Sequence, residues 1–286
     1  FTIIGNPTGN VDIDKIITGQ PLFGLDYKKE GMLIAMIQHA PAFGMKLKSI
    51  DASIAKNMPG IKDVFAVNSE PEDKQWCDNN AFPETVAIVG ETTWQVMKAR
   101  KEIKTEWEWA SNGENTSDHE KKLAEILEKE PEKHNRKDGD PDKAFKNAAK
   151  TIERTYSAPF LAHNTMEPMN FFADVTPEKA ELVGPIQTPE FMRKSVASLV
   201  GLPEDKVSVM MTRMGGGFGR RLYGNFGLEA AAISKKINAP VKLIYSREDD
   251  MTQGLYRPAY RIKYRAALDE SNNLIGFHVR GAGIHG

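Results

Sequence analysis

The sequence lacks several features that define large classes of protein. It has one cysteine in 286 residues, Cys77, so no internal disulfide and no multi-cysteine zinc or iron–sulfur site is possible within this chain. Basic and acidic residues nearly balance, 38 against 39, and no stripe of lysine or arginine is present. This balance argues against a surface for nucleic acid or for an anionic membrane, because both need clustered positive charge.

Long hydrophobic runs are also absent. The longest purely apolar stretch is residues 32–37, far shorter than the roughly 20 residues that a membrane-spanning helix needs. The chain begins without methionine or a signal-peptide pattern, and it ends on a glycine-rich segment, residues 281–286. We therefore expect both ends to be those of a fragment.

The residues that are present have an ordinary globular composition, with 40% hydrophobic and 27% charged. Short strand-like runs alternate with helix-like runs in two stretches, which predicts an α+β fold with two units. We expect a first domain over residues 1–110, a charged and partly helical connector over 111–150, and a second domain over 151–286.

One segment of the second unit is unusual. A helix is predicted from Thr188-Pro189 to Gly201, since a cap residue followed by proline is preferred at a helix start and glycine at its end. A strand over residues 206–212 then runs directly into Met-Gly-Gly-Gly-Phe-Gly-Arg-Arg, residues 214–221, which we call the glycine loop. Apolar residues at helical spacing from 228 to 237 predict that a helix follows.

The glycine loop has the composition of a ligand cradle. Four glycines in the five positions 215–219 remove side chains, so the N–H groups can approach an anionic or oxo ligand closely. A dinucleotide fingerprint would need glycine where Arg220 or Leu222 stands, and a phosphate-binding loop needs lysine followed by serine or threonine. A glycine-rich corner between packed elements remains the alternative.

Two other groups near this segment are candidates for binding. Gln187, at the start of the predicted helix, can donate to an oxo group or bond to turn backbone. His163 and Glu167 are four residues apart, but Pro168 argues against a helix that would bring both to one metal ion. A buried, hydrogen-bonded turn is the expectation there.

No side chain qualifies as a nucleophile or a base. Cys77 is next to Asp78, whose negative charge hinders thiolate formation. Asp249 and Asp250 are adjacent, so their side chains diverge if they lie in a strand. The residues alone thus offer a main-chain cradle and a glutamine.

Together these residues resemble the molybdenum-binding subunit of the xanthine dehydrogenase and aldehyde oxidase family. The resemblance rests on Gln187, on the glycine loop, and on the later phrases Ser-Arg-Glu-Asp-Asp-Met at 246–251 and Arg-Pro-Ala-Tyr at 257–260. The Gly-Arg-Arg ending is most similar to the isoquinoline 1-oxidoreductase β-subunit branch. The first domain is similar to the family's α/β-hammerhead domain, which implies that residues 151–286 are the first part of an α+β molybdopterin-binding domain.

The resemblance implies an activity and its cofactors. Members hydroxylate an electron-poor carbon of an aldehyde or N-heterocycle, take the oxygen from water, and pass two electrons to iron–sulfur clusters. A molybdenum-pterin cofactor in its cytosine dinucleotide form is implied, with a partner subunit that carries two 2Fe–2S clusters. Gln187 would have a catalytic role, bonding to the oxo or apical ligand of the metal. The cofactor-binding residues implied in the same way are Gly216, Gly217, Phe218, Gly219 and Arg220.

Two departures from the family pattern limit these expectations. Purine-oxidising relatives carry a glutamate four residues after the loop phenylalanine, and Leu222 stands there, so xanthine is not the expected substrate. The family's catalytic glutamate lies beyond Gly286, so we expect this chain alone to be inactive and without cofactor. A non-catalytic scaffold or assembly protein stays open as an alternative, as does a nucleotide-binding domain that ATP or NAD would stabilise. The residues favour neither the cytoplasm nor the periplasm.

Overall fold

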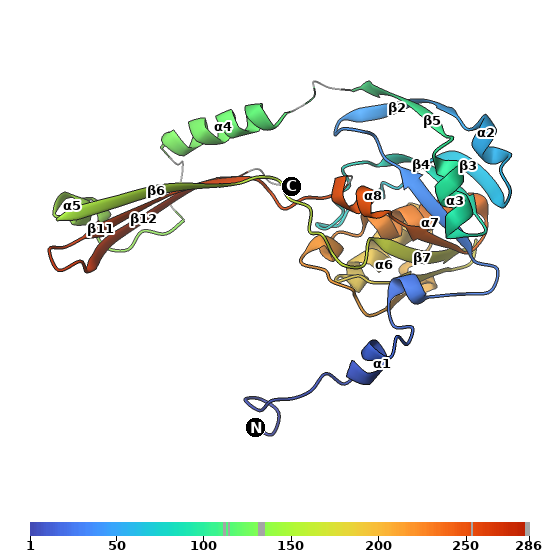
Figure 1. The fold of residues 1–286 in the computed structure, drawn as a ribbon, viewed down its shortest axis with the longest axis horizontal. Coiled ribbons are helices and arrows are strands. Elements are labelled where there is room, and N and C mark those ends of the chain that lie inside the picture. The colour runs from blue at the N-terminus through green and yellow to red at the C-terminus, as the bar shows by residue number, and fades with distance from the viewer. Residues whose placement is uncertain (111–112, 114, 131–134, 253, 284–286) are drawn as a thin grey trace. The chain divides into compact units, whose positions relative to one another are not determined.

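The computed structural model describes residues 1–110, 113, 115–130, 135–252 and 254–283 (Figure 1). The chain divides into two compact units, each built from separate segments of the sequence. The first unit takes residues 1–112 and 162–255, and the second takes residues 113–161 and 256–286.

A mixed seven-stranded sheet forms the frame of the first unit. In spatial order its strands are β3 (Ile61–Asn68), β4 (Glu84–Gly90), β1 (Leu33–Gln38), β10 (Val241–Ile244), β7 (Asn170–Val175), β8 (Ala180–Gly184) and β9 (Val207–Met211). Strands β1 and β10 pair in parallel, as do β8 and β9, and the other neighbours are antiparallel. Strand β1 is buried on both faces, which explains why its sequence is continuously apolar.

Helices pack on both faces of this sheet (Figure 1). The elements concerned are α2 (Ser53–Lys56), α3 (Thr93–Arg100), α6 (Pro189–Val200), α7 (Asn225–Ile237), and a ribbon of β2 (Met45–Asp51) and β5 (Lys104–Trp109). Odd-numbered residues of β1 enter the core beneath α6 and α7, and even-numbered residues enter the core beneath α2 and α3. The sheet is therefore the middle layer between two hydrophobic cores.

Shorter elements complete the first unit. They are α1 (Ile13–Ile17), α8 (Arg247–Thr252) and the 3-10 turns η1 (Gly24–Asp26), η2 (Glu204–Lys206) and η3 (Arg220–Leu222). The idea of a strand at Asp249 and Asp250 is wrong, since both lie in α8. Their side chains do diverge: Asp249 pairs with Arg100, and Asp250 Oδ2 lies 3.1 Å from Arg247 Nη1.

The second unit is a three-stranded antiparallel sheet with two helices. Its strands, in spatial order, are β12 (Leu274–Gly283), β11 (Tyr260–Leu268) and β6 (Lys150–Ala158), and its helices are α4 (Thr116–Glu128) and α5 (Pro141–Lys146). Leu123 and Leu127 of α4 pack against Ala259 and Ala282. Both helices fall in the expected connector, 111–150, of which residues 111–112, 114 and 131–134 lie outside the described residues.

The mixed α/β character expected from the sequence is confirmed, whereas the compact units cut across the expected consecutive domains. The physical reason is the parallel pairing of β1 with β10, which joins the N-terminal strands to residues 162–255 in one sheet. The α/β-hammerhead assignment of residues 1–110 stays a prediction. Within the part of the chain that the structure describes, no helix is long and apolar enough to cross a membrane.

Helix ends predicted from the sequence can be compared residue by residue. Gly201 ends α6 in the left-handed conformation, with φ of 74°, as predicted. Thr188 does precede α6, but its hydroxyl makes no cap and instead donates to the carbonyl of Leu222 at 2.9 Å. The start of α6 is therefore tied to the residue that follows the glycine loop.

Candidate functional site

The glycine loop joins β9 to α7 and has an unusual backbone. Gly216, Phe218 and Gly219 have φ of 98°, 53° and 95°. This region is open to glycine but costs an L-residue roughly 1–2 kcal/mol, and the Phe218 side chain is 65% exposed, so its own packing does not explain the conformation. Backbone strain of this kind clusters at functional sites.

Several main-chain donors of the loop have no partner within the protein. Among the described residues, the amide groups of residues 216–219 donate no hydrogen bond, and these residues are partly exposed. On either side the amides are paired, since Gly215 donates to Glu167 Oε2 and Arg220 donates to the carbonyl of Gly217, both at 2.8 Å. A short run of free donors between fixed ends suits an anionic or oxo-bearing ligand.

Gln187 lies directly against this loop. Its backbone N–H donates to the carbonyl of Arg221 at 2.9 Å, which fixes its main chain. A Cβ on Gly217 would stand 2.8 Å from Gln187 Oε1, so the side chain occupies the space that a residue larger than glycine would fill. Because Gln187 is exposed, its amide is also open to a ligand. The structure thus brings together Gln187 and the glycine loop, which the sequence had identified as separate candidates for binding.

Glu167 fixes the beginning of the loop. Its Oε1 accepts hydrogen bonds from Leu25 N at 3.1 Å and Asn170 Nδ2 at 3.0 Å, while Oε2 accepts from Gly215 N. Arg221 Nη2 lies 3.4 Å from the same Oε2, in an ion pair that is almost completely buried. The carboxylate therefore joins η1, β7 and the glycine loop.

The sequence did not reveal this role of Glu167. The hydrogen-bonded turn expected around Pro168 is confirmed, because Thr165 Oγ1 donates to the carbonyl of Glu167 at 2.7 Å in the buried interior. The only local signal was a carboxylate before a proline, which says nothing of distant partners. No cluster of three or more potential metal ligands among His, Cys, Asp and Glu occurs in the described residues.

Arg220 and Arg221 are both buried, and their side chains diverge. Arg221 Nε donates to the carbonyl of Gly216 at 2.8 Å, whereas Arg220 Nη1 donates to Asn225 Oδ1 at 3.0 Å. Both guanidinium groups lie over the ring of Phe226, at 6.0 and 5.6 Å from its centre. Burial lowers the pKa of Arg221 to about 10 and also lowers the pKa of Arg220. The Arg220 guanidinium faces the interior, so its role in cofactor binding stays a prediction.

These features agree with the comparison against known families. The sequence model of one family, described as the molybdopterin cofactor-binding domain, matches residues 123–286 of this chain. That stretch includes Gln187 and the whole glycine loop. The chain belongs to this family. The resemblance to the xanthine dehydrogenase and aldehyde oxidase family is thereby confirmed.

Individual relatives are similar to this chain along nearly its whole length. The isoquinoline 1-oxidoreductase subunit beta of Brevundimonas diminuta is 28% identical over 96% of the chain and 35% of its own length. A membrane-bound aldehyde dehydrogenase of Gluconacetobacter polyoxogenes, named as a pyrroloquinoline-quinone enzyme, is 28% identical over 95% of the chain and 35% of its own. The chain thus spans about a third of these relatives.

A solved structure has the same fold. Quinoline 2-oxidoreductase from Pseudomonas putida 86 superimposes with a TM-score of 0.73 at 20% identity, over 97% of this chain and 39% of that one. The chain therefore has the fold of the part of that structure with which it superimposes.

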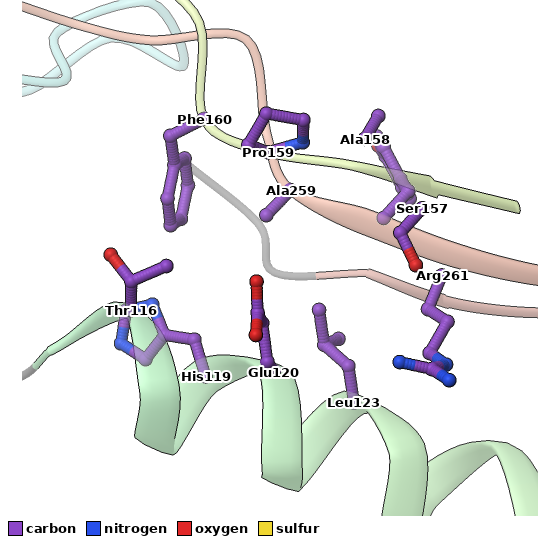
Figure 2. Close-up of a pocket in the computed structure, with 11 residues that line it drawn as sticks. Thr116, His119, Glu120, Leu123, Ser157, Ala158, Pro159, Phe160, Ala259 and Arg261 are labelled. Carbon is purple, nitrogen blue, oxygen red and sulfur yellow. The ribbon is translucent and has the colours of Figure 1, made fainter.

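A pocket lies within the second unit. Figure 2 shows it between α4 and the strands β6 and β11, with a volume of about 190 Å³. Side chains of Thr116, Glu120 and Leu123 point from α4 toward it. None of the site residues predicted from the sequence lines this pocket.

Phe218 offers a direct test of strain in the loop. We expect Phe218→Gly to leave the chain about 1 kcal/mol more stable than Phe218→Ala, because both lose the exposed ring but only glycine relieves the left-handed conformation. Urea unfolding of the two variants measures the difference. Equal stabilities would show that the backbone at residue 218 is not strained.

Cys77 is expected to be unreactive in the folded molybdopterin-binding chain. It is 2% exposed, and burial, followed by the negative charge of Asp78, raises the pKa of its thiol. Reaction with an aromatic disulfide reagent should be at least about tenfold slower in buffer than in 8 M urea, allowing for the effect of urea on a model thiol. Equal rates would contradict the burial.

Proposed function

We propose that this chain is part of the large subunit of a molybdenum hydroxylase that oxidises an aldehyde or an N-heterocycle with water as the oxygen source. The observation that carries the proposal is the run of free main-chain donors at residues 216–219 with the exposed amide of Gln187 beside it. Family membership supports the same cofactor.

The residues of the loop fit such a group. When bound, a molybdenum-pterin cofactor supplies the two-electron oxidation of the substrate carbon. The N–H groups of residues 216–219, which donate no hydrogen bond among the described residues, would stabilise its negative charge. The amide of Gln187 would donate a hydrogen bond at the metal's oxo ligand. We propose the cytosine dinucleotide form of the cofactor.

The residue that follows the glycine loop, Leu222, bears on the substrate class. Its side chain cannot hydrogen-bond to a purine, and it stands where purine-oxidising relatives carry a glutamate. Electrons would leave through a partner subunit with two 2Fe–2S clusters, as the resemblance to the family implies. An aldehyde or an N-heterocycle is therefore the substrate that we propose.

Gln187→Ala tests the site in the full-length enzyme. We expect kcat to fall about a hundredfold, since removal of one preorganised donor typically has this effect, with KM changed much less. The matched control is Gln20→Ala, an exposed glutamine outside the loop, which should leave both constants unchanged. Unchanged kinetics in Gln187→Ala would remove Gln187 from the site.

The nature of the cofactor can be tested by extraction. Full-length protein should yield about one molybdenum and one pterin per chain. A relative is named as a quinone enzyme, so a quinone recovered without pterin would contradict the proposal. Folded full-length protein with neither group would favour the scaffold alternative. Residues 1–286 alone are predicted to hold no stoichiometric molybdenum, and a ratio near one per chain would contradict that prediction.

A further inference from the structure

A buried hydrogen-bonded network begins where the glycine loop ends. Its members are Arg220, Asn225, Tyr245, Glu229 and His39, whose exposed fractions are 3%, 4%, 1%, 0% and 4%. Polar groups so deeply buried are costly unless they are paired, so the network needs an explanation.

Tyr245 is the centre of this network. Its hydroxyl donates to Glu229 Oε2 at 2.6 Å, accepts from Asn225 Nδ2 at 3.3 Å, and lies 3.3 Å from His39 Nε2. The other carboxylate oxygen of Glu229 is 3.1 Å from the same ring nitrogen. Burial, followed by the negative charge of Glu229, raises the pKa of Tyr245 well above its usual value, so its hydroxyl keeps the proton that it donates.

The topology of the sheet assembles these groups. His39 follows the last residue of β1, and Tyr245 follows the last residue of β10, and these two strands are parallel neighbours. Their carboxyl ends therefore meet at one edge of the sheet. Asn225 and Glu229 are one turn apart on α7, which packs on that sheet, so they face the same edge.

The two arginines that end the glycine loop are held differently. Arg221 is paired with the carboxylate of Glu167 and with three main-chain carbonyls, those of Gly216, Glu167 and Pro185. Arg220 has no carboxylate within ion-pair distance among the described residues, and its Nη2 has no acceptor. Within the described residues, its guanidinium group donates one hydrogen bond, to Asn225, whose side-chain amide in turn donates to the hydroxyl of Tyr245. The position of Arg220 thus depends on the network.

We propose that Tyr245 and Glu229 are positioning residues of the cofactor site, which act through Asn225 on Arg220 and so keep the glycine loop in the conformation that leaves the N–H groups of residues 216–219 without protein acceptors. The effect on cofactor retention rests on the proposed function. The effect on the loop itself does not, because it concerns only contacts within this chain.

The rate of cleavage by trypsin after Arg220 and Arg221 reports directly on opening of the loop, because both residues are buried in the folded chain. Tyr245→Phe removes one hydroxyl at nearly constant volume and leaves Asn225 and Glu229 short of a partner. We expect cleavage after these arginines to become about tenfold faster, as the loss of a hydrogen bond to a buried charged group implies. Cleavage after Arg136, whose side chain is 85% exposed, should not change.

A matched control variant distinguishes an effect of the network on cleavage from the general effect of removing a tyrosine hydroxyl. Tyr27→Phe makes the same change in the same unit, on a ring that packs against Phe172 of β7 and is not a member of the network. It should not accelerate cleavage after Arg220. Glu229→Gln keeps an acceptor for Tyr245 and should retain more protection than Glu229→Leu. Unchanged cleavage in Tyr245→Phe, or an equal acceleration in Tyr27→Phe, overturns the proposal.

A second measurement connects the network to the cofactor. In the full-length enzyme, Tyr245→Phe should release its pterin about tenfold faster, as followed by pterin fluorescence, while the urea midpoint shows whether the fold is retained. Faster cleavage with unchanged pterin release overturns the functional part of the proposal. If wild-type enzyme holds no pterin, the proposed function fails, and the trypsin result still decides the effect on the loop.

Discussion

Glu167→Ala is expected to lower the free energy of unfolding by about 3–5 kcal/mol. The change removes the carboxylate that pairs with Arg221 and leaves a buried guanidinium without its counter-charge. It also leaves the amides of Leu25 and Gly215 without their acceptor. Urea unfolding followed by circular dichroism gives the difference in free energy.

Two variants sharpen the experiment on Glu167. Glu178→Ala removes an exposed carboxylate from the turn between β7 and β8, so its effect should stay within about 0.5 kcal/mol. Glu167→Gln keeps an acceptor oxygen but not the charge, so its free energy of unfolding should lie between those of wild type and Glu167→Ala. A loss below about 1 kcal/mol in Glu167→Ala would show that the carboxylate does not hold the loop.

Gly217→Ala is expected to reduce kcat of the full-length enzyme about a hundredfold while leaving its stability within about 1 kcal/mol of wild type. The new Cβ would stand 2.8 Å from Gln187 Oε1 and 3.2 Å from Cδ, so the glutamine must move. Its side chain is exposed and can swing away at small cost, but the proposed donor then leaves the place where it is needed. Steady-state kinetics and urea unfolding measure the two effects.

A double variant tests whether Gly217 acts through Gln187. If it does, Gly217→Ala in a Gln187→Ala background should add almost no further loss, because the two residues are in contact and share one effect. Gly9→Ala is the matched control, since no atom lies within 4 Å of the added Cβ. Full turnover by Gly217→Ala would mean that contact between the loop and Gln187 is not part of the site.

The predictions on Glu167 and on Tyr245 concern two sets of contacts that hold one loop. Glu167 accepts from the amide of Gly215 near the start of the loop and forms a buried ion pair with Arg221, the last residue of the loop. The side-chain amide of Asn225, which donates to Tyr245, accepts a hydrogen bond from Arg220. The free donors lie between these two supports, which explains how a strained Phe218 persists in a partly exposed segment.

Local structure around the site could be predicted because its causes are local. The proline and glycine at the two ends of α6 act within one helical turn, and the apolar alternation of β9 and the periodicity of α7 bracket the glycine loop. The cap at Thr188 failed for a tertiary reason, since the carbonyl of Leu222 takes its hydroxyl. A residue distant in sequence had displaced the local interaction.

By itself the sequence determined the chemistry of the loop: residues 215–219 carry almost no side chains, so only main-chain groups can face a ligand there, and their neighbours identify the family. Only the tertiary structure decided that β1 pairs with β10, that Glu167 anchors Gly215, and that Arg220 turns inward. The physical reason is that backbone freedom is a property of each residue. Partners for buried charges, in contrast, are chosen by the packing of the whole chain, where burial makes an unpaired group too costly to tolerate.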